Sequence, residues 1–207
     1  MKLTEAKLKQ LIREVLEEGM KTLDDLPEGV FIKVDGDVED VIDVYYANSE
    51  GRQIKFKNDS NPYGSISMDL EVQLSEDFPC LGALMVAYSD ASRGWGPLLY
   101  DVAIEVATLK GGGLVCDRSI VSQDAYNVWD KYNNQRDDVE KLQLDDEVSS
   151  RTPDPNDDCL QNISYEYEEK TGIPWHESPL SKLYRKPPTT INALKKAGRL
   201  KTEEINL

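Results

Sequence analysis

The chain has 207 residues, of which 39% are hydrophobic and 30% are charged, and its formal net charge at pH 7 is −15. This length is enough for one domain of ordinary size with additional segments. So negative a charge argues against binding nucleic acid or an anionic membrane through the surface as a whole, and the sequence has neither a membrane-length apolar run nor the apolar core of a secretion signal.

An amphipathic helix is expected over residues 4–18, where apolar residues recur at helical spacing: Leu8, Leu11, Ile12, Val15 and Leu16. The helix either docks on its own domain or forms a detachable leader. The segment resembles N-terminal segments of proteins of large tailed phages, in some of which a head protease cuts after Leu/Ile-x-Glu. Leu16-Glu17-Glu18, directly before Gly19, fits that pattern.

A linker over Lys21–Gly29 precedes a series of expected strands: Val30–Val34, Val41–Ala47, Gln53–Lys57, Ile66–Leu74 and Leu81–Tyr88. A hairpin turn is expected at Ser49–Arg52. The alternation of apolar and polar residues over Ile66–Leu74 is typical of an antiparallel strand with one face in water.

A glycine-rich turn, Arg93-Gly94-Trp95-Gly96, lies between the last of these strands and an expected helix over Pro97–Leu109. Such a turn presents free backbone amides at the positive end of a helix dipole, which suits a pyrophosphate. The alternative is an ordinary strand-to-helix loop that needs glycine for its backbone angles. A strand at Leu114–Cys116 and a helix at Ser122–Asn133 follow.

This order resembles the core of the GNAT N-acyltransferase superfamily, over roughly Gly29 to Tyr132. The resemblance implies that the turn holds the pyrophosphate of acetyl-CoA or another acyl-CoA. It assigns cofactor binding to Val86, Ala87, Tyr88, Arg93, Gly94, Trp95 and Gly96. Ser122 stands in the place of an Asn that opens the family's next helix.

The resemblance also implies a general acid on that helix. Trp129 falls about where the family has a Tyr, so Tyr132 and Tyr126 are the candidate acids, and Asp117 is an acid/base candidate after the second strand. Leu98 also departs from the family, which has a small residue at the end of the turn. The helices that build the family's acceptor site are absent from the short stretch Asp35–Asp40, which leaves the acceptor unspecified.

The expected fold is α+β, with an antiparallel-to-mixed twisted sheet and a strand-helix-strand-helix core. The expected organisation is an N-terminal helix (residues 1–20), a GNAT-like domain (residues 29–145) and a C-terminal extension (residues 146–207). The extension begins acidic, with a charge run expected to be solvated, and ends basic. The basic end is expected to fold back on the acidic segment; the alternative is that it contacts a phosphate-bearing ligand or a partner.

Cys80, Cys116 and Cys159 are odd in number and widely spaced, so no metal site and no disulfide is expected, and a reducing interior is the simplest compartment. Cys80 and Cys116 are interpreted as small core residues. The single histidine, His176, lies in a loop-like stretch with no identifiable catalytic partner.

The leading functional hypothesis is an acyl-CoA-dependent N-acyltransferase, in the cytoplasm, acting on an unknown amine. The alternative is a non-catalytic phage protein of the same fold, associated with the virion and contacting the phage head or another protein through the N-terminal helix. A third hypothesis is an interaction module whose acidic segment mimics nucleic acid.

Overall fold

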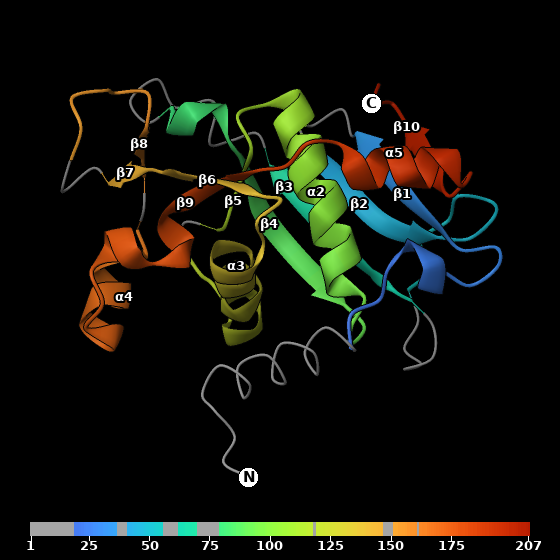
Figure 1. Ribbon diagram of the computed structural model, residues 1–207, viewed down its shortest axis with the longest axis horizontal. Helices are drawn as coiled ribbons and strands as arrows, with labels where there is room; N and C mark the ends of the chain where they lie inside the picture. Colours follow the sequence, from blue (N-terminus) through green and yellow to red (C-terminus); the bar gives the residue numbers. More distant parts are fainter. Residues whose placement is uncertain are drawn as a thin grey trace, which may run out of the picture.

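The computed structural model describes residues 19–36, 41–55, 62–69, 79–117, 119–146, 151–160 and 162–207. The predicted N-terminal helix, residues 56–57 and residues 70–74 of two predicted strands lie outside the described residues. Within the described ranges, eight strands form one sheet in the order β10-β1-β2-β3-β4-β5-β9-β6 (Figure 1). These strands are β1 (Phe31–Gly36), β2 (Val41–Ala47), β3 (Gly64–Asp69), β4 (Leu84–Ala91), β5 (Leu114–Val115), β6 (Glu140–Gln143), β9 (Lys182–Arg185) and β10 (Leu200–Glu203).

The sheet is mixed. Strands β1 to β4 form an antiparallel meander, whereas β4 with β5 and β1 with β10 are parallel pairs. β9 is antiparallel to both β5 and β6. The protein is therefore of the α+β class, as the sequence predicts, with a mixed open sheet.

The long helix α2 (Gly96–Lys110) lies across one face of the sheet, with α5 (Thr189–Lys196) beside it (Figure 1). Side chains of β2 and β3 alternate between buried and half-buried, which places residues such as Val44, Ile66 and Met68 beneath α2. The other helices are α3 (Gln123–Gln135) and α4 (Ser164–Thr171). Short 3-10 turns lie at η1 (Leu23–Asp25), η3 (Cys80–Gly82), η4 (Trp175–Glu177) and η5 (Pro179–Ser181).

Most predicted elements recur with shifted ends. The strand Val41–Ala47 is confirmed, but the predicted strand at Gln53–Lys57 is reduced, in its described part, to an isolated bridge between Gln53 and Ala47. The strand predicted from Leu81 begins only at Leu84. The reason is a tight turn in which Leu81 has φ 54° and its carbonyl approaches Gly112 so closely that a Cβ there would lie 1.8 Å from it.

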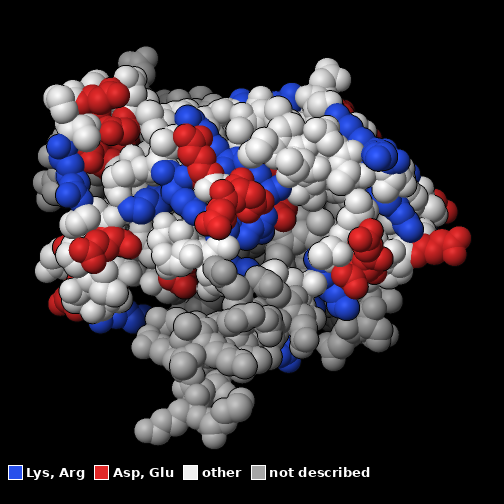
Figure 2. Space-filling model, viewed as in Figure 1, with Lys and Arg blue, Asp and Glu red and all other residues white. Residues whose placement is uncertain are grey.

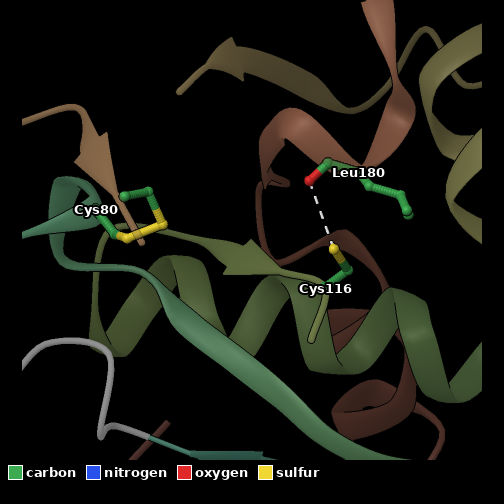
Figure 3. Close-up of a disulfide and its surroundings, with 4 residues drawn as sticks. Cys80, Cys116 and Leu180 are labelled. Atoms are coloured by element: carbon green, nitrogen blue, oxygen red, sulfur yellow. Dashed lines mark hydrogen bonds between the residues drawn. A yellow bond between two sulfur atoms is a disulfide. The ribbon is translucent and has the colours of Figure 1, made fainter. Parts of the chain in front are cut away.

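Cys80 and Cys159 form a disulfide, with their Cα atoms 4.5 Å apart (Figure 3). The prediction that no disulfide forms was therefore wrong. The expected absence of disulfides had supported a reducing compartment, and that support is removed. The sequence hides the pairing because 79 positions separate the two cysteines. A small parallel pair, β7 (Asp145–Asp146) and β8 (Asp158–Cys159), carries Cys159 to the turn at Cys80. Cys116, by contrast, is a buried free thiol, as predicted, and donates to the Leu180 carbonyl (Figure 3).

The C-terminal segment completes the sheet instead of standing apart from it. β9 lies between β5 and β6, and β10 extends the edge beside β1, so the boundary expected at residue 146 does not divide the sheet. The basic side chains of this segment form hydrogen bonds mostly with other parts of the fold and less with the acidic run. Arg199 donates to the carbonyls of Pro27 and Val30, and Lys201 donates to that of Ser49.

Acidic and basic side chains are interspersed on the face shown in Figure 2, and a row of basic side chains lies over α5 and β10. Among the helices within the described ranges, none combines the length and apolar character that crossing a membrane requires. The expectation that the acidic run is solvated fails at Asp145, which is only 1% exposed.

Candidate functional site

Two neighbouring parallel strands diverge at the centre of the sheet. β4 and β5 pair only at Leu84 with Leu114 and at Met85 with Val115, after which β5 ends while β4 continues to Ala91. A gap therefore opens beside the carboxyl half of β4, where ligands of open sheets commonly bind. A cavity of about 250 Å³ occupies it. Its lining comes from β4, α2, α3 and the loop after β5: Val86, Ala87, Ser89, Tyr100, Asp117, Ile120, Val121, Ser122, Ala125 and Trp129.

A β-bulge lies in β4 beside this gap. Ser67 pairs with Tyr88 and Met68 pairs with Val86, so Ala87 is an extra residue without an opposite residue in β3. A bulge bends and twists its strand and often lies next to a binding site. Val86 and Ala87 line the gap cavity, whereas Tyr88 is 56% exposed and lines neither this cavity nor the larger one beside it.

The larger cavity, of about 520 Å³, lies at the N-terminus of α2. Its walls come from the end of β4, the glycine turn, the first turns of α2 and the N-terminal half of α3, and they include Arg93, Gly94, Gly96 and Asp124. α2 begins at Gly96 without a side-chain cap, and Pro97 lies in its first turn. The N-terminus of a 15-residue helix therefore lies at this cavity, where the first-turn amides other than Pro97, which has no N–H, could donate to an anion.

Trp95 has a structural role in the turn. It is 4% exposed, its ring packs edge-on against Tyr46, and the Tyr46 hydroxyl donates to the Trp95 carbonyl at 2.7 Å. The Trp95 amide donates to the Ser92 carbonyl at 3.0 Å. Trp95, which the resemblance placed at the cofactor, therefore anchors the turn to the core, and it is not among the residues lining either cavity.

A short N-terminal segment covers the other side of the turn. The Lys21 amide donates to the Gly94 carbonyl at 2.9 Å, and a Cβ on Gly94 would lie 2.3 Å from the Gly19 carbonyl oxygen. Gly94 also has φ +84°, which favours glycine. Gly19 and Lys21 therefore cover this side of the turn.

The ionisable side chains of the larger cavity are of both signs. Arg93 is exposed at its edge, and Asp90 and Asp124 also line it. Asp124 lies in the first turn of α3, where a carboxylate complements the helix dipole. An anion here would be held by Arg93 and by the amides of α2, against the two carboxylates.

Ser122 connects the two cavities to a third groove of about 400 Å³. It is the N-cap of α3, as predicted, and its Oγ accepts from the Ala125 amide at 3.2 Å. The third groove lies between the start of α3 and α4. Tyr126 lines it, with its ring stacked on that of Tyr167 at 6.2 Å, and burial raises the pKa of Tyr126.

Tyr132 lies away from all three spaces. It is 2% exposed, and its hydroxyl lies within hydrogen-bonding distance of two acceptors, the Asp101 carboxylate at 2.8 Å and the Pro97 carbonyl at 3.3 Å. Burial raises the pKa of Tyr132 well above its usual value. Asp101 also pairs with Arg136 at 3.0 Å. The structure therefore separates the two candidate acids, with Tyr126 in the groove and Tyr132 in a buried network.

Asp117 lines the gap cavity, as its position after β5 suggests. Its Oδ1 accepts from the amides of Ser119 and Ile120 at 2.6 and 3.0 Å, so one carboxylate oxygen shapes the loop. His176 lies in η4, 3.8 Å from Glu177, and lines none of these spaces.

Sequence reasoning missed Tyr100, which lines both cavities and is only 4% exposed. Its hydroxyl donates to Ser89 Oγ at 3.1 Å. The helix expected over Pro97–Leu109 includes Tyr100, but no role was predicted for this residue. Tyr100 lies three and four residues before Ala103 and Ile104, which are both buried. This helical spacing is the signal that could have found it.

One group of carboxylates outside the cavities has the spacing of a metal site. Ligand oxygens of Asp145, Asp157 and Asp158 lie within 4.8 Å of one another. Amides of Arg151 and Thr152 donate to Asp145 Oδ2 at 2.7 Å each. The pKa of Asp157 is raised, first by burial and then by the neighbouring carboxylates.

Comparison of the chain with protein-family models, curated proteins and solved structures found no match.

Proposed function

We propose that the protein is an acyl-CoA-dependent N-acyltransferase of GNAT type. The observation that carries this proposal is the junction of two cavities along β4. One lies at the uncapped N-terminus of α2 with Arg93, and the other lies where β4 and β5 diverge. An acyl-CoA has a matching sequence of groups, with a nucleotide end that carries the pyrophosphate and, beyond the pyrophosphate, an extended amide-bearing arm.

The donor would be held by backbone groups along its length. Arg93 and the first-turn amides of α2 would bind the pyrophosphate, since helix N-termini and guanidinium groups both favour phosphate. The arm would lie along β4 from Ser89 to Val86, where no described strand pairs on the β5 side. An extended ligand can add to such an edge through backbone hydrogen bonds.

The acyl carbonyl would then lie near the bulge at Ala87. An amine attacks this carbon, a C–N bond forms and the amine loses a proton. The C–S bond breaks with its electron pair on the sulfur, so CoA leaves as a thiolate that then takes up a proton. Positioning supplies much of the acceleration in such a direct transfer. Asp117 is the carboxylate in the gap that could accept the amine's proton. Tyr126, which lines the adjoining groove together with Tyr167, is the candidate acid for the thiolate. The amine would enter from that groove.

Mass spectrometry of small molecules that co-purify with the full chain, followed by titration with acetyl-CoA, tests the proposal. We expect a CoA species in the protein or a saturable rise in melting temperature. Arg93→Ala should lower the acetyl-CoA affinity, while Arg52→Ala, which removes an exposed arginine in the β2 hairpin turn, should not. No co-purifying CoA species and no thermal shift would overturn the proposal.

A second candidate is a non-catalytic protein of the same fold, for instance a phage virion component. Two observations favour it: Trp129 is buried where the resemblance calls for a tyrosine, and the Tyr132 hydroxyl is bonded to Asp101. Acetyl-CoA binding without transfer to any amine would support it. Detection of chains beginning at Gly19 in purified virions would identify the virion role.

A further inference from the structure

Two hydroxyl groups meet where the two cavities join. The Tyr100 hydroxyl on α2 donates to Ser89 Oγ on β4 at 3.1 Å, and both residues line both cavities. The other walls of the gap cavity are largely apolar, with Val86, Val121 and Trp129 among them. A few placed polar groups in an otherwise apolar pocket are what fix a ligand's orientation.

The bulge in β4 is what brings Ser89 to this position. With the register of Met68 and Val86 continued unbroken, Tyr88 would stand opposite Ile66, whose side chain faces the core. The extra residue at Ala87 places Ser89 opposite Ile66 instead and leaves Tyr88 exposed. Since side chains alternate along a strand, the bulge exchanges a large ring for a small hydroxyl at the cavity.

Because Tyr100 is the donor in this hydrogen bond, the Ser89 hydroxyl can still donate its own proton. The Tyr100 hydroxyl donates to Ser89 Oγ, and burial raises the pKa of Tyr100, so Tyr100 keeps its proton near neutral pH. A serine hydroxyl that accepts one bond still has its own proton to give. A donor that is itself hydrogen-bonded is strengthened by the chain of bonds. Trp129 packs edge-on against the Tyr100 ring at 5.5 Å and fixes its orientation.

We infer that Ser89 donates a hydrogen bond to a carbonyl oxygen in the acyl-bearing arm of the donor, and that Tyr100 is the positioning residue for Ser89. This inference rests on the proposed function. It names the residues that bind the arm of the donor and not its nucleotide. Arg93 and the α2 amides would hold the nucleotide end, so the two ends of the ligand depend on different side chains.

Isothermal titration of the full chain with acetyl-CoA, CoA and 3′,5′-ADP tests the inference, because 3′,5′-ADP contains the nucleotide end alone. Ser89→Ala should weaken acetyl-CoA binding by about three- to tenfold, the range of one net hydrogen bond, and leave 3′,5′-ADP binding unchanged. Tyr100→Phe should act in the same direction, and Ser89→Thr should restore affinity. Weakening for acetyl-CoA alone assigns the thioester carbonyl, and weakening for CoA as well assigns an amide carbonyl of the arm.

Tyr45→Phe is the matched control, because it removes a tyrosine hydroxyl that donates to Asp35 at 3.0 Å, outside both cavities, and should change no affinity. Equal affinities of wild type and Ser89→Ala for acetyl-CoA would overturn the inference while the proposed function stands. Equal weakening for all three probes would show a general structural effect and would also overturn it. Failure of the wild type to bind any probe would overturn the proposed function and this inference with it.

Discussion

Glu105→Ala should be among the most damaging single substitutions in this protein. Glu105 is fully buried in the middle of α2 and forms an ion pair with Lys186, which is 2% exposed. The same carboxylate caps α5. Its Oε1 accepts from the Thr190 amide at 2.8 Å and its Oε2 accepts from the Ile191 amide at 2.7 Å. One side chain thus ties the C-terminal segment to the central helix.

The magnitude follows from what the alanine would leave behind. The ammonium of Lys186 would stay buried without the carboxylate, and two amides of α5 would lose their acceptor. Breaking a buried ion pair costs about 3–5 kcal/mol. Against a typical total stability of about 5–15 kcal/mol, this is a large fraction. For a chain of this size it corresponds to a fall in melting temperature of about 6–20 °C.

Urea unfolding followed by circular dichroism measures the effect, with Lys186→Met as the matched variant. Lys186→Met removes the cation but keeps the cap on α5, so it should cost less than Glu105→Ala. The double variant should be more stable than the sum of the two single losses predicts, because the residues are in contact. A loss below about 1 kcal/mol for Glu105→Ala would show that the buried ion pair and the cap on α5 contribute little to stability.

Three further results are expected. Gly94→Ala should lower stability by more than the roughly 1–2 kcal/mol that an alanine in the left-handed region costs, because the Gly19 carbonyl lies where the new Cβ would go. Gly172→Ala is the control, because Gly172 has φ +68° with open space around it, and equal losses in the two variants would contradict the steric argument. Reduction of the Cys80–Cys159 disulfide should cost up to about 4.5 kcal/mol on the chain-entropy model, and an unchanged melting temperature in reductant would argue against it. The Arg136 guanidinium lowers the pKa of Asp138, so this ion pair should stabilise the fold above the ordinary pKa of the carboxyl and lose that effect as the pH falls through the pKa of Asp138 in the folded protein. Asp138→Asn should remove this pH dependence, and stability-versus-pH curves that run parallel for wild type and variant would contradict the assignment.

The class of the fold and its central order were readable from the sequence. The apolar runs of β2 and β4, the glycines after α2 and the cap at Ser122 are local signals, and each predicts an element that the structure contains. The disulfide and the place of β10 beside β1 depend on pairings between distant residues, which periodicity does not encode.

The candidate site was predictable in its backbone and less so in its side chains. The turn from Arg93 to Gly96 does open α2 beside a cavity, because strand, glycine turn and helix are consecutive in the chain. Tyr100 and Ser89 meet only because a bulge shifts the register of β4. No pattern in the sequence marks that extra residue, so the pair could not be found without the structure.

Titration of acetyl-CoA into the full chain and into its Arg93→Ala variant shows whether the glycine turn binds an acyl-CoA. We expect saturable binding to the wild type at one site. We also expect the variant to lose about 1.5–3 kcal/mol of binding free energy, with no change in melting temperature without ligand, because Arg93 is exposed at the cavity edge. Absence of binding to the wild type, or equal affinity in both proteins, would contradict the proposal.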